Sequence, residues 1–179
     1  TAHPTFKGND GTLAFVKTAV SEDSTVYTFA PAALAEFSPK MSITLDRNLV
    51  MNVYIPKAGL GAFTLDGVKY EDLASLAENT VTLDGKEYCL IKIELPASMA
   101  ARKVVLSATV SSGGASANAT FTFSIPRYAE LVIADGSEVE KQLVRDVLSY
   151  IRAAYAYFGT TDAEAMAKID AILGEGYDA

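Results

Sequence analysis

The spacing of the apolar residues changes between residues 119 and 159, and this change limits the possible folds more than any other feature. From residue 119 to 125, apolar and polar residues alternate, as in a strand with one buried face. Further along, apolar residues recur every three or four positions, as on one side of a helix. This predicted stripe consists of Val139, Leu143, Val144, Val147, Leu148, Ile151, Ala154, Tyr155 and Phe158. The pattern predicts a β-rich body followed by a helical C-terminal part.

Capping signals predict where the C-terminal helices begin and end. Residues 137–140, Ser-Glu-Val-Glu, form a capping box, and Gly159 is suited to the left-handed residue that ends a helix. A second capping box at 161–164, Thr-Asp-Ala-Glu, opens a helix that continues to Gly174. Because about two residues join the helices, we expect them to fold back on each other as a hairpin.

The part of the chain before these helices is rich in predicted strands. They cover residues 25–30, 41–55 with a turn or bulge at 46–48, 87–95, 103–110 and 116–125. Asp66-Gly67 and Asp84-Gly85 each stand between apolar runs and favour type I′ hairpin turns. Residues 128–134 fit either one more strand or the lead-in to the first helix.

These elements predict a mainly β fold with a C-terminal two-helix hairpin, which is α+β overall. An antiparallel β-sandwich, Ig-like or related, is the architecture we expect for the strands. The expected organisation is an N-terminal stub at 1–11, the sandwich at 12–134, and the hairpin at 135–179, packed on or beside the sandwich.

The usual catalytic residue sets are missing from the sequence. His3 is its one histidine, so Ser-His-Asp and Cys-His arrangements lack their base, and no nucleotide-binding glycine motif is present. Cys89 is the lone cysteine, among apolar neighbours, and is expected to be a buried small hydrophobe. We therefore expect no enzyme, and no catalytic, cofactor-binding or metal-binding residues.

Two alternatives to that expectation stay open. A carboxylate pair such as Glu71 with Asp72, or Asp84 with Glu87, would suffice for glycoside hydrolysis if the groups faced each other. Calcium could be held at residues 9–11, 46–48 or the Asp-Gly turns, although turn formation already explains these residues.

The tyrosines near the end of the first predicted helix are the candidate ligand-binding residues. Sugar rings stack on exposed aromatic side chains, and this chain has no Trp but nine Tyr and eight Phe. Tyr150 and Tyr157 lie near the edges of the apolar stripe and are the two that we single out. The competing interpretation is that these rings seal the helix against the sheet.

Charge and hydropathy exclude some classes of partner. A net charge of −7 argues against nucleic acid, which needs a concentrated basic face. No stretch approaches the roughly 18–20 apolar residues needed to span a bilayer, so we expect no membrane insertion. The expected partner is an unknown protein or glycan, or a neighbouring domain of the same polypeptide.

Residues 143–159, with Leu-Val, Leu-Ser-Tyr, Ala-Ala and Tyr-Phe in succession, resemble a helix of uncharacterised secreted or cell-surface proteins of anaerobic Gram-positive bacteria. Residues 42–46, 52–54 and 125–129 are similar to the strands and lead-in that precede this helix in those proteins. The resemblance implies export and a place in a modular surface protein, and it implies no known activity.

The expected function is therefore that of a non-catalytic extracellular or cell-surface module for adhesion, spacing, or recognition of a protein or glycan. One alternative is a carboxylate-based glycoside hydrolase or an accessory domain of one. Another is an oligomerisation module that acts through the C-terminal helices.

Overall fold

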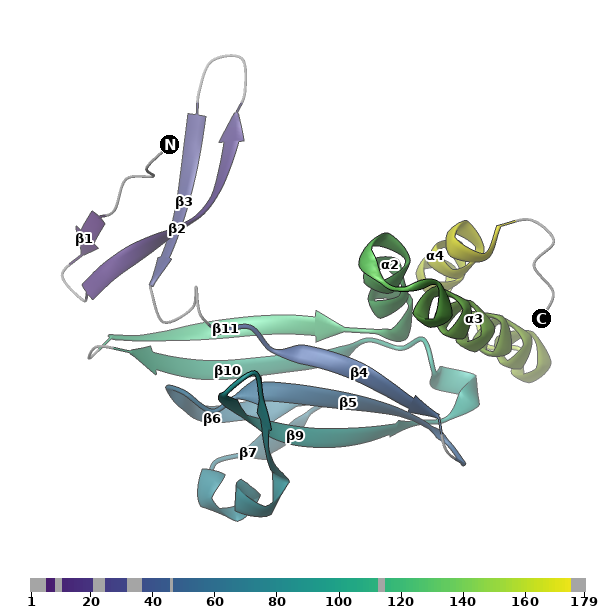
Figure 1. Cartoon of the computed structure of the whole chain (residues 1–179), viewed down its shortest axis with the longest axis horizontal. Helices are drawn as coiled ribbons and strands as arrows, with labels where there is room; N and C mark the ends of the chain where they lie inside the picture. The colour runs from purple at the N-terminus through teal and green to yellow at the C-terminus, as the bar shows by residue number, and fades with distance from the viewer. Residues whose placement is uncertain are drawn as a thin grey trace. The chain divides into compact units, whose positions relative to one another are not determined.

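The computed structural model describes residues 6–8, 11–20, 25–31, 37–45, 47–112 and 115–174 (Figure 1). Contacts divide the chain into two compact units that alternate along the sequence. The strand unit comprises Thr1–Lys40, Tyr54–Leu90 and Val105–Phe121, and the helical unit comprises Met41–Val53, Ile91–Val104 and Thr122–Ala179. The predicted division into domains 12–134 and 135–179 stays a prediction.

The first strands form a three-stranded antiparallel sheet in the order β1-β2-β3 (Figure 1). They are β1 (Phe6–Gly8), β2 (Gly11–Val20) and β3 (Thr25–Pro31). Strand β1 thus lies among the residues predicted as an N-terminal stub. His3 lies outside the described residues.

A four-stranded antiparallel sheet has the order β11-β10-β6-β7. Its strands are β6 (Leu60–Leu65), β7 (Val68–Tyr70), β10 (Val104–Ser112) and β11 (Ala115–Phe123). The turn between β6 and β7 has φ of 53° at Asp66 and 79° at Gly67. Two successive positive φ values characterise a type I′ turn, so this prediction is confirmed.

A second four-stranded antiparallel sheet has the order β4-β5-β9-β8. Its strands are β4 (Lys40–Leu45), β5 (Leu49–Pro56), β8 (Thr80–Leu83) and β9 (Lys86–Leu95). The β8–β9 turn repeats the same geometry, with φ of 51° at Asp84 and 76° at Gly85. Asp46, in the predicted turn between β4 and β5, is outside the described residues.

Successive strands occupy these two sheets in pairs. The chain leaves β5 for β6 and β7, returns to β8 and β9, and then crosses to β10 and β11. Two short 3-10 helices accompany the crossings, η1 (Leu73–Asn79) before β8 and η2 (Ala97–Met99) before β10. With helices after the last strand, the fold is mixed α+β, as predicted at that level.

Three α-helices follow the strands in the described part of the chain, one more than the predicted hairpin. They are α2 (Ile125–Asp135), α3 (Glu138–Phe158) and α4 (Ala163–Leu173). The capping box of Ser137 and Glu140 and the left-handed Gly159 are present as predicted for α3. In α4 the N-cap is Asp162, whose side chain accepts from the Ala165 amide, so the predicted capping box beginning at Thr161 is wrong by one residue.

Helix α2 replaces the strand or lead-in expected at 128–134. The Ser124 hydroxyl accepts a hydrogen bond from the Arg127 amide at 3.3 Å, and Pro126 stands in the first turn. A serine N-cap followed by proline is a strong helix start, because proline lacks only an amide that the first turn does not use. The run of Leu131, Val132 and Ile133 is compatible with a strand as well as with a helix, so the sequence left both alternatives open.

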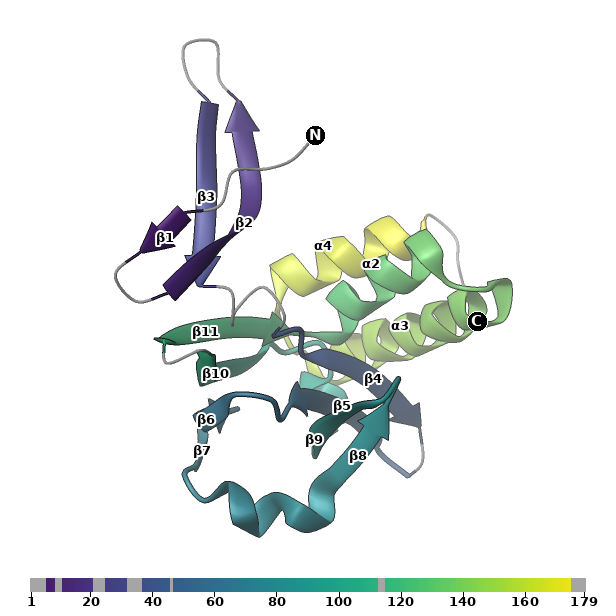
Figure 2. The same cartoon turned by 60° about the vertical axis from the view of Figure 1, so that its left-hand side comes forward.

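The three helices lie side by side in both views (Figure 2). Helix α3 contacts α2, α4 and η2, and α2 contacts α4. The side of α3 that is buried by this packing carries Val144, Val147, Leu148, Ile151, Ala154 and Tyr155. Hydrophobic burial of this face is the main source of stability for the helices, because propensity alone leaves short helices marginal.

Candidate functional site

The exposed side of α3 carries a row of large apolar residues, which includes both predicted ligand-binding tyrosines. Tyr150 is 53% exposed and Tyr157 is 84% exposed. Val139 and Leu143, earlier in the helix, are 80% and 56% exposed. The four residues are separated by 4, 7 and 7 positions, so they align along one side of the helix. We call this row the outer stripe of α3.

The outer stripe corrects the predicted assignment of the apolar residues of α3. Val139, Leu143 and Phe158 were placed with the buried stripe, yet all three are exposed. Phe158 instead packs its ring edge against Tyr157, with centroids 5.0 Å apart. Helix α3 therefore has two apolar sides, one packed within the helical unit and one facing solvent.

Buried polar contacts tie the C-terminal half of α3 to the segment after β9. The Tyr155 hydroxyl accepts a hydrogen bond from the Ala101 amide at 2.9 Å, and both residues are buried. Just beyond the helix, the Thr160 hydroxyl donates to the Ser98 carbonyl at 3.0 Å. Burial raises the pKa of the Tyr155 hydroxyl, and the Ala101 amide partly opposes that rise.

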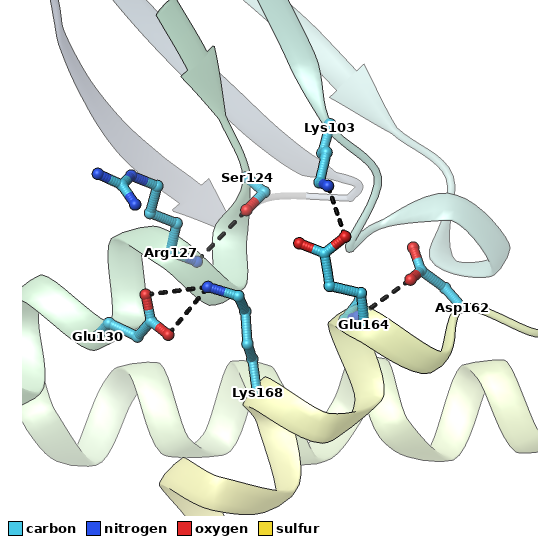
Figure 3. A network of polar contacts seen from close by, with 8 residues as sticks. Lys103, Ser124, Arg127, Glu130, Asp162, Glu164 and Lys168 are labelled. Carbon is cyan, nitrogen blue, oxygen red and sulfur yellow. Dashed lines mark hydrogen bonds and ion pairs between the residues drawn. The ribbon is translucent and has the colours of Figure 1, made fainter.

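Ion pairs connect α4 to its surroundings, and Figure 3 shows two of them. Lys103 Nζ lies 2.6 Å from a Glu164 carboxylate oxygen, and Lys168 Nζ lies 3.1 Å from one of Glu130 on α2. A further pair joins Asp170 to Arg152 of α3, with 3.8 Å between Oδ1 and Nη1. Exposed pairs of this kind contribute little stability each, about 0–1 kcal/mol. The Lys168–Glu130 pair joins α4 to α2, and the Lys103–Glu164 pair joins α4 to the segment just before β10.

A second candidate surface lies on the solvent-facing side of the β11-β10-β6-β7 sheet. Thr120, Ser107, Thr64 and Lys69 stand opposite one another across the four strands. In the neighbouring row, the Thr109 hydroxyl donates to the Asn118 side-chain oxygen at 3.1 Å. These residues line a shallow depression of about 280 Å³. We did not predict this surface from the sequence, although its polar residues alternate with buried ones along β10 and β11.

A larger depression of about 640 Å³ lies in the strand unit. The buried side chains of Phe37 and Val110 form part of its wall, and Lys57, Lys86 and Glu87 add charged groups. Lys57 Nζ already donates to the Thr80 hydroxyl at 3.0 Å. Two of its lining residues, Phe37 and Ser112, border gaps in the described sequence, so we assign the depression no ligand.

Glu71 and Asp72, the first carboxylate pair considered for glycoside hydrolysis, are exposed and have structural partners. Glu71 pairs with Lys69 at 2.6 Å, and this hydrogen bond lowers the pKa of Glu71. Asp72 accepts from the Ala74 amide at the start of η1. A general acid needs a raised pKa, which is the opposite of what Lys69 does to Glu71.

The second carboxylate pair and the remaining candidate groups also fill structural roles. Asp84 sits in its turn, 3.7 Å from Lys40 Nζ, and is highly exposed, whereas Glu87 lies on β9. Cys89 is buried, and burial raises the pKa of its thiol, as expected of a structural cysteine. No group of three His, Cys, Asp or Glu side chains converges among the residues the structure describes.

Comparisons with protein-family models, curated proteins and solved structures found no match to this chain. No helix in the described ranges combines the length and the apolar character needed to cross a membrane.

Proposed function

We propose that this chain is a non-catalytic recognition module that contacts a protein through the outer stripe of α3. The observation that carries the proposal is the alignment of Val139, Leu143, Tyr150 and Tyr157 on the solvent-facing side of one capped, packed helix. Isolated exposed apolar residues are ordinary, but several large ones aligned on one side of a helix are typical of an interaction surface.

The composition of the stripe favours a protein partner over a glycan. Sugar rings stack on aromatic rings and form hydrogen bonds around them, whereas Val139 and Leu143 offer only aliphatic surface. Tyrosine combined with aliphatic residues is common at the centre of protein interfaces. An extracellular or cell-surface location belongs to the proposal as well, supported by the resemblance of residues 143–159 to a helix of secreted proteins.

The proposal includes the predicted β-sandwich, Ig-like or related, as the scaffold that carries the helices. Its support is the alternating burial in both four-stranded sheets. Val104, Leu106, Ala108 and Val110 are buried on β10 with more exposed residues between them, and β5 follows a similar pattern. A sheet with one continuous apolar face must cover that face, and a second sheet is a common solution.

A capture experiment with matched variants tests the recognition proposal. The double variant Leu143→Ser/Tyr157→Ser removes apolar surface from the stripe, and Leu131→Ser removes it from an exposed position on α2. Immobilised wild-type chain and Leu131→Ser should both retain a defined set of surface proteins that the double variant loses. Equal retention by all three would refute a role for the stripe. Turnover of a sugar or peptide substrate, abolished by changing one acidic pair, would refute a non-catalytic function.

Glycan recognition is a second candidate, favoured by the polar face of the β11-β10-β6-β7 sheet. Hydroxyl, amide and ammonium groups of Thr64, Lys69, Ser107, Asn118 and Thr120 surround one shallow depression there. Such groups match the hydroxyls of a sugar chain. On a glycan array, Asn118→Ala should weaken any signal of the wild-type chain while Tyr157→Ser leaves it intact. The reverse result would move glycan binding to α3.

A further inference from the structure

The outer stripe of α3 has the spacing of a helix that pairs with another helix. Leu143, Tyr150 and Tyr157 repeat every seven residues, and Val139, Asp146 and Ala153 form the alternating positions of the same repeat. Apolar residues at alternating steps of three and four keep one seam facing a partner helix along its whole length. Ala153 is small and exposed, which leaves room for a large side chain opposite it.

We propose that the occupant of this seam is a second copy of the chain, with the two α3 helices antiparallel. This inference rests on the proposed function and specifies the partner. In the register that places Asp146 opposite Tyr150 of the second copy, Val139 faces Tyr157 and Leu143 faces Ala153. Each large side chain then meets a smaller one, and each Tyr150 hydroxyl can donate a hydrogen bond to the Asp146 carboxylate of the other copy. This carboxylate accepts one from the Gln142 side chain of its own helix and has room for another.

Charge favours the antiparallel arrangement over the parallel one. Helix α3 carries three acidic and three basic residues, so pairing two whole α3 helices adds no net charge despite the chain's −7, and the seam itself holds one charged residue per copy, Asp146. A parallel pair would set Asp146 against Asp146 and the acidic N-terminal turns, with Glu138 and Glu140, side by side. The antiparallel pair separates the acidic N-terminal turns, staggers the two Asp146 residues by four positions along the seam (about 6 Å), and opposes the two helix dipoles.

The area of the stripe approaches what a modest dimer needs. Tyr150 and Tyr157 are 53% and 84% exposed. At about 150–250 Å² per buried ring, they leave roughly 200–350 Å² of ring surface in each copy. Two copies together would therefore bury roughly 400–700 Å² from rings, to which the exposed surfaces of Val139 and Leu143 add. The total approaches the roughly 1,000 Å² expected of a specific interface.

Sedimentation equilibrium of the full chain tests the association. The wild-type chain should show a concentration-dependent dimer, and Leu143→Ser or Tyr157→Ser should each raise the dissociation constant at least about tenfold. Leu131→Ser, a similar loss of exposed apolar surface on α2, should leave it unchanged. A wild-type chain that stays monomeric at high concentration, or variants that associate as tightly as the wild type, would overturn the inference.

Disulfide trapping tests the register. Leu143→Cys and Ala153→Cys are made in separate chains of different mass, with Cys89 left in place because it is buried. Mild oxidation should cross-link a mixture of the two chains and neither chain alone. Cross-linking of each chain to its own kind would contradict the antiparallel register. If the chain proves monomeric while stripe variants still lose a captured protein, self-association fails and the proposed recognition function stands.

Discussion

Replacing Tyr155 by phenylalanine isolates the contribution of one buried hydrogen bond to the helical unit. The ring is almost fully buried, at 3% exposure, and its hydroxyl accepts from the Ala101 amide at 2.9 Å. Phenylalanine keeps the ring and its packing, so the change opens no large cavity. What it removes is the acceptor, which leaves the amide of Ala101, itself 2% exposed, without this partner.

The expected cost follows from that geometry. A buried donor that loses its partner costs about 1–3 kcal/mol, more than the net value of an average hydrogen bond. Tyr157→Phe is the matched control, since it is the same chemical change two residues away on the same helix. Its hydroxyl belongs to an 84% exposed side chain, so its effect should stay within about 0.5 kcal/mol of zero.

Urea unfolding followed by the helical circular dichroism signal is the appropriate assay, because the described α-helices all lie in the helical unit. Tyr155→Phe should lower the midpoint at unchanged slope, by roughly 0.3–1.5 M for a slope of about 2–3 kcal/mol per M. Equal midpoints for the two variants would show that the Ala101 amide finds another partner and would refute the reasoning.

The same pair of residues predicts a pH dependence with a definite sign. Burial raises the pKa of Tyr155 in the folded state, so the unfolded chain releases this proton first as the pH increases. Its contribution to stability is therefore full below about pH 10, the ordinary tyrosine value, and is lost as the pH rises towards the folded pKa. Tyr155→Phe lacks the group, so its unfolding midpoint should decline less between about pH 9 and about pH 11 than that of the wild type. An identical decline would contradict this sign.

Two further predictions concern backbone geometry and capping. At Gly59 an added Cβ would overlap the Ser111 carbonyl and φ is +70°, whereas at Gly67 φ is +79° with open space around it. In thermal unfolding, Gly67→Ala should therefore lower the stability only by the left-handed penalty of about 1–2 kcal/mol, and Gly59→Ala should lower it clearly more. Equal losses for the two variants would contradict the overlap. Ser137→Ala should cost about 1 kcal/mol by removing the α3 cap. Hydrogen bonds from Ser137 lower the pKa of Glu140, so the stability that these hydrogen bonds provide is present at neutral pH and lost on acidification. Ser137→Ala should therefore lose less stability on acidification than the wild type does.

Features set by neighbouring residues were predictable from the sequence. Each Asp-Gly turn needs only two residues that tolerate positive φ, and the capping box of α3 needs only Ser137 and Glu140. Features set by long-range contacts were not. The apolar run at 131–133 fits a strand equally well, and the helix depends both on the start at Ser124 and Pro126 and on the packing of α2 against α3 and α4. The polar face around Asn118 likewise depends on how four strands align.

The outer stripe shows why periodicity alone did not separate the core of α3 from its interaction surface. The spacing of the apolar residues identifies the apolar positions of a helix. It does not show which neighbouring element, if any, covers each position. Within the described structure, α2, α4 and η2 cover one side, and Leu143 and Tyr157 stay exposed on the other.

The free energy gained by burying the exposed side of α3 determines whether a partner would bind there. At about 25 cal/mol per Å², the roughly 200–350 Å² of exposed tyrosine ring surface in each copy corresponds to roughly 5–9 kcal/mol. Two such faces together give roughly 10–18 kcal/mol, which is comparable with the roughly 4–15 kcal/mol that association costs, so side-chain ordering decides the affinity. One face against a polar surface gives half that gain, in the lower half of the range of costs. A partner that is itself apolar along the roughly 20 Å of helix from Leu143 to Tyr157 is therefore favoured, and a second α3 has such a surface.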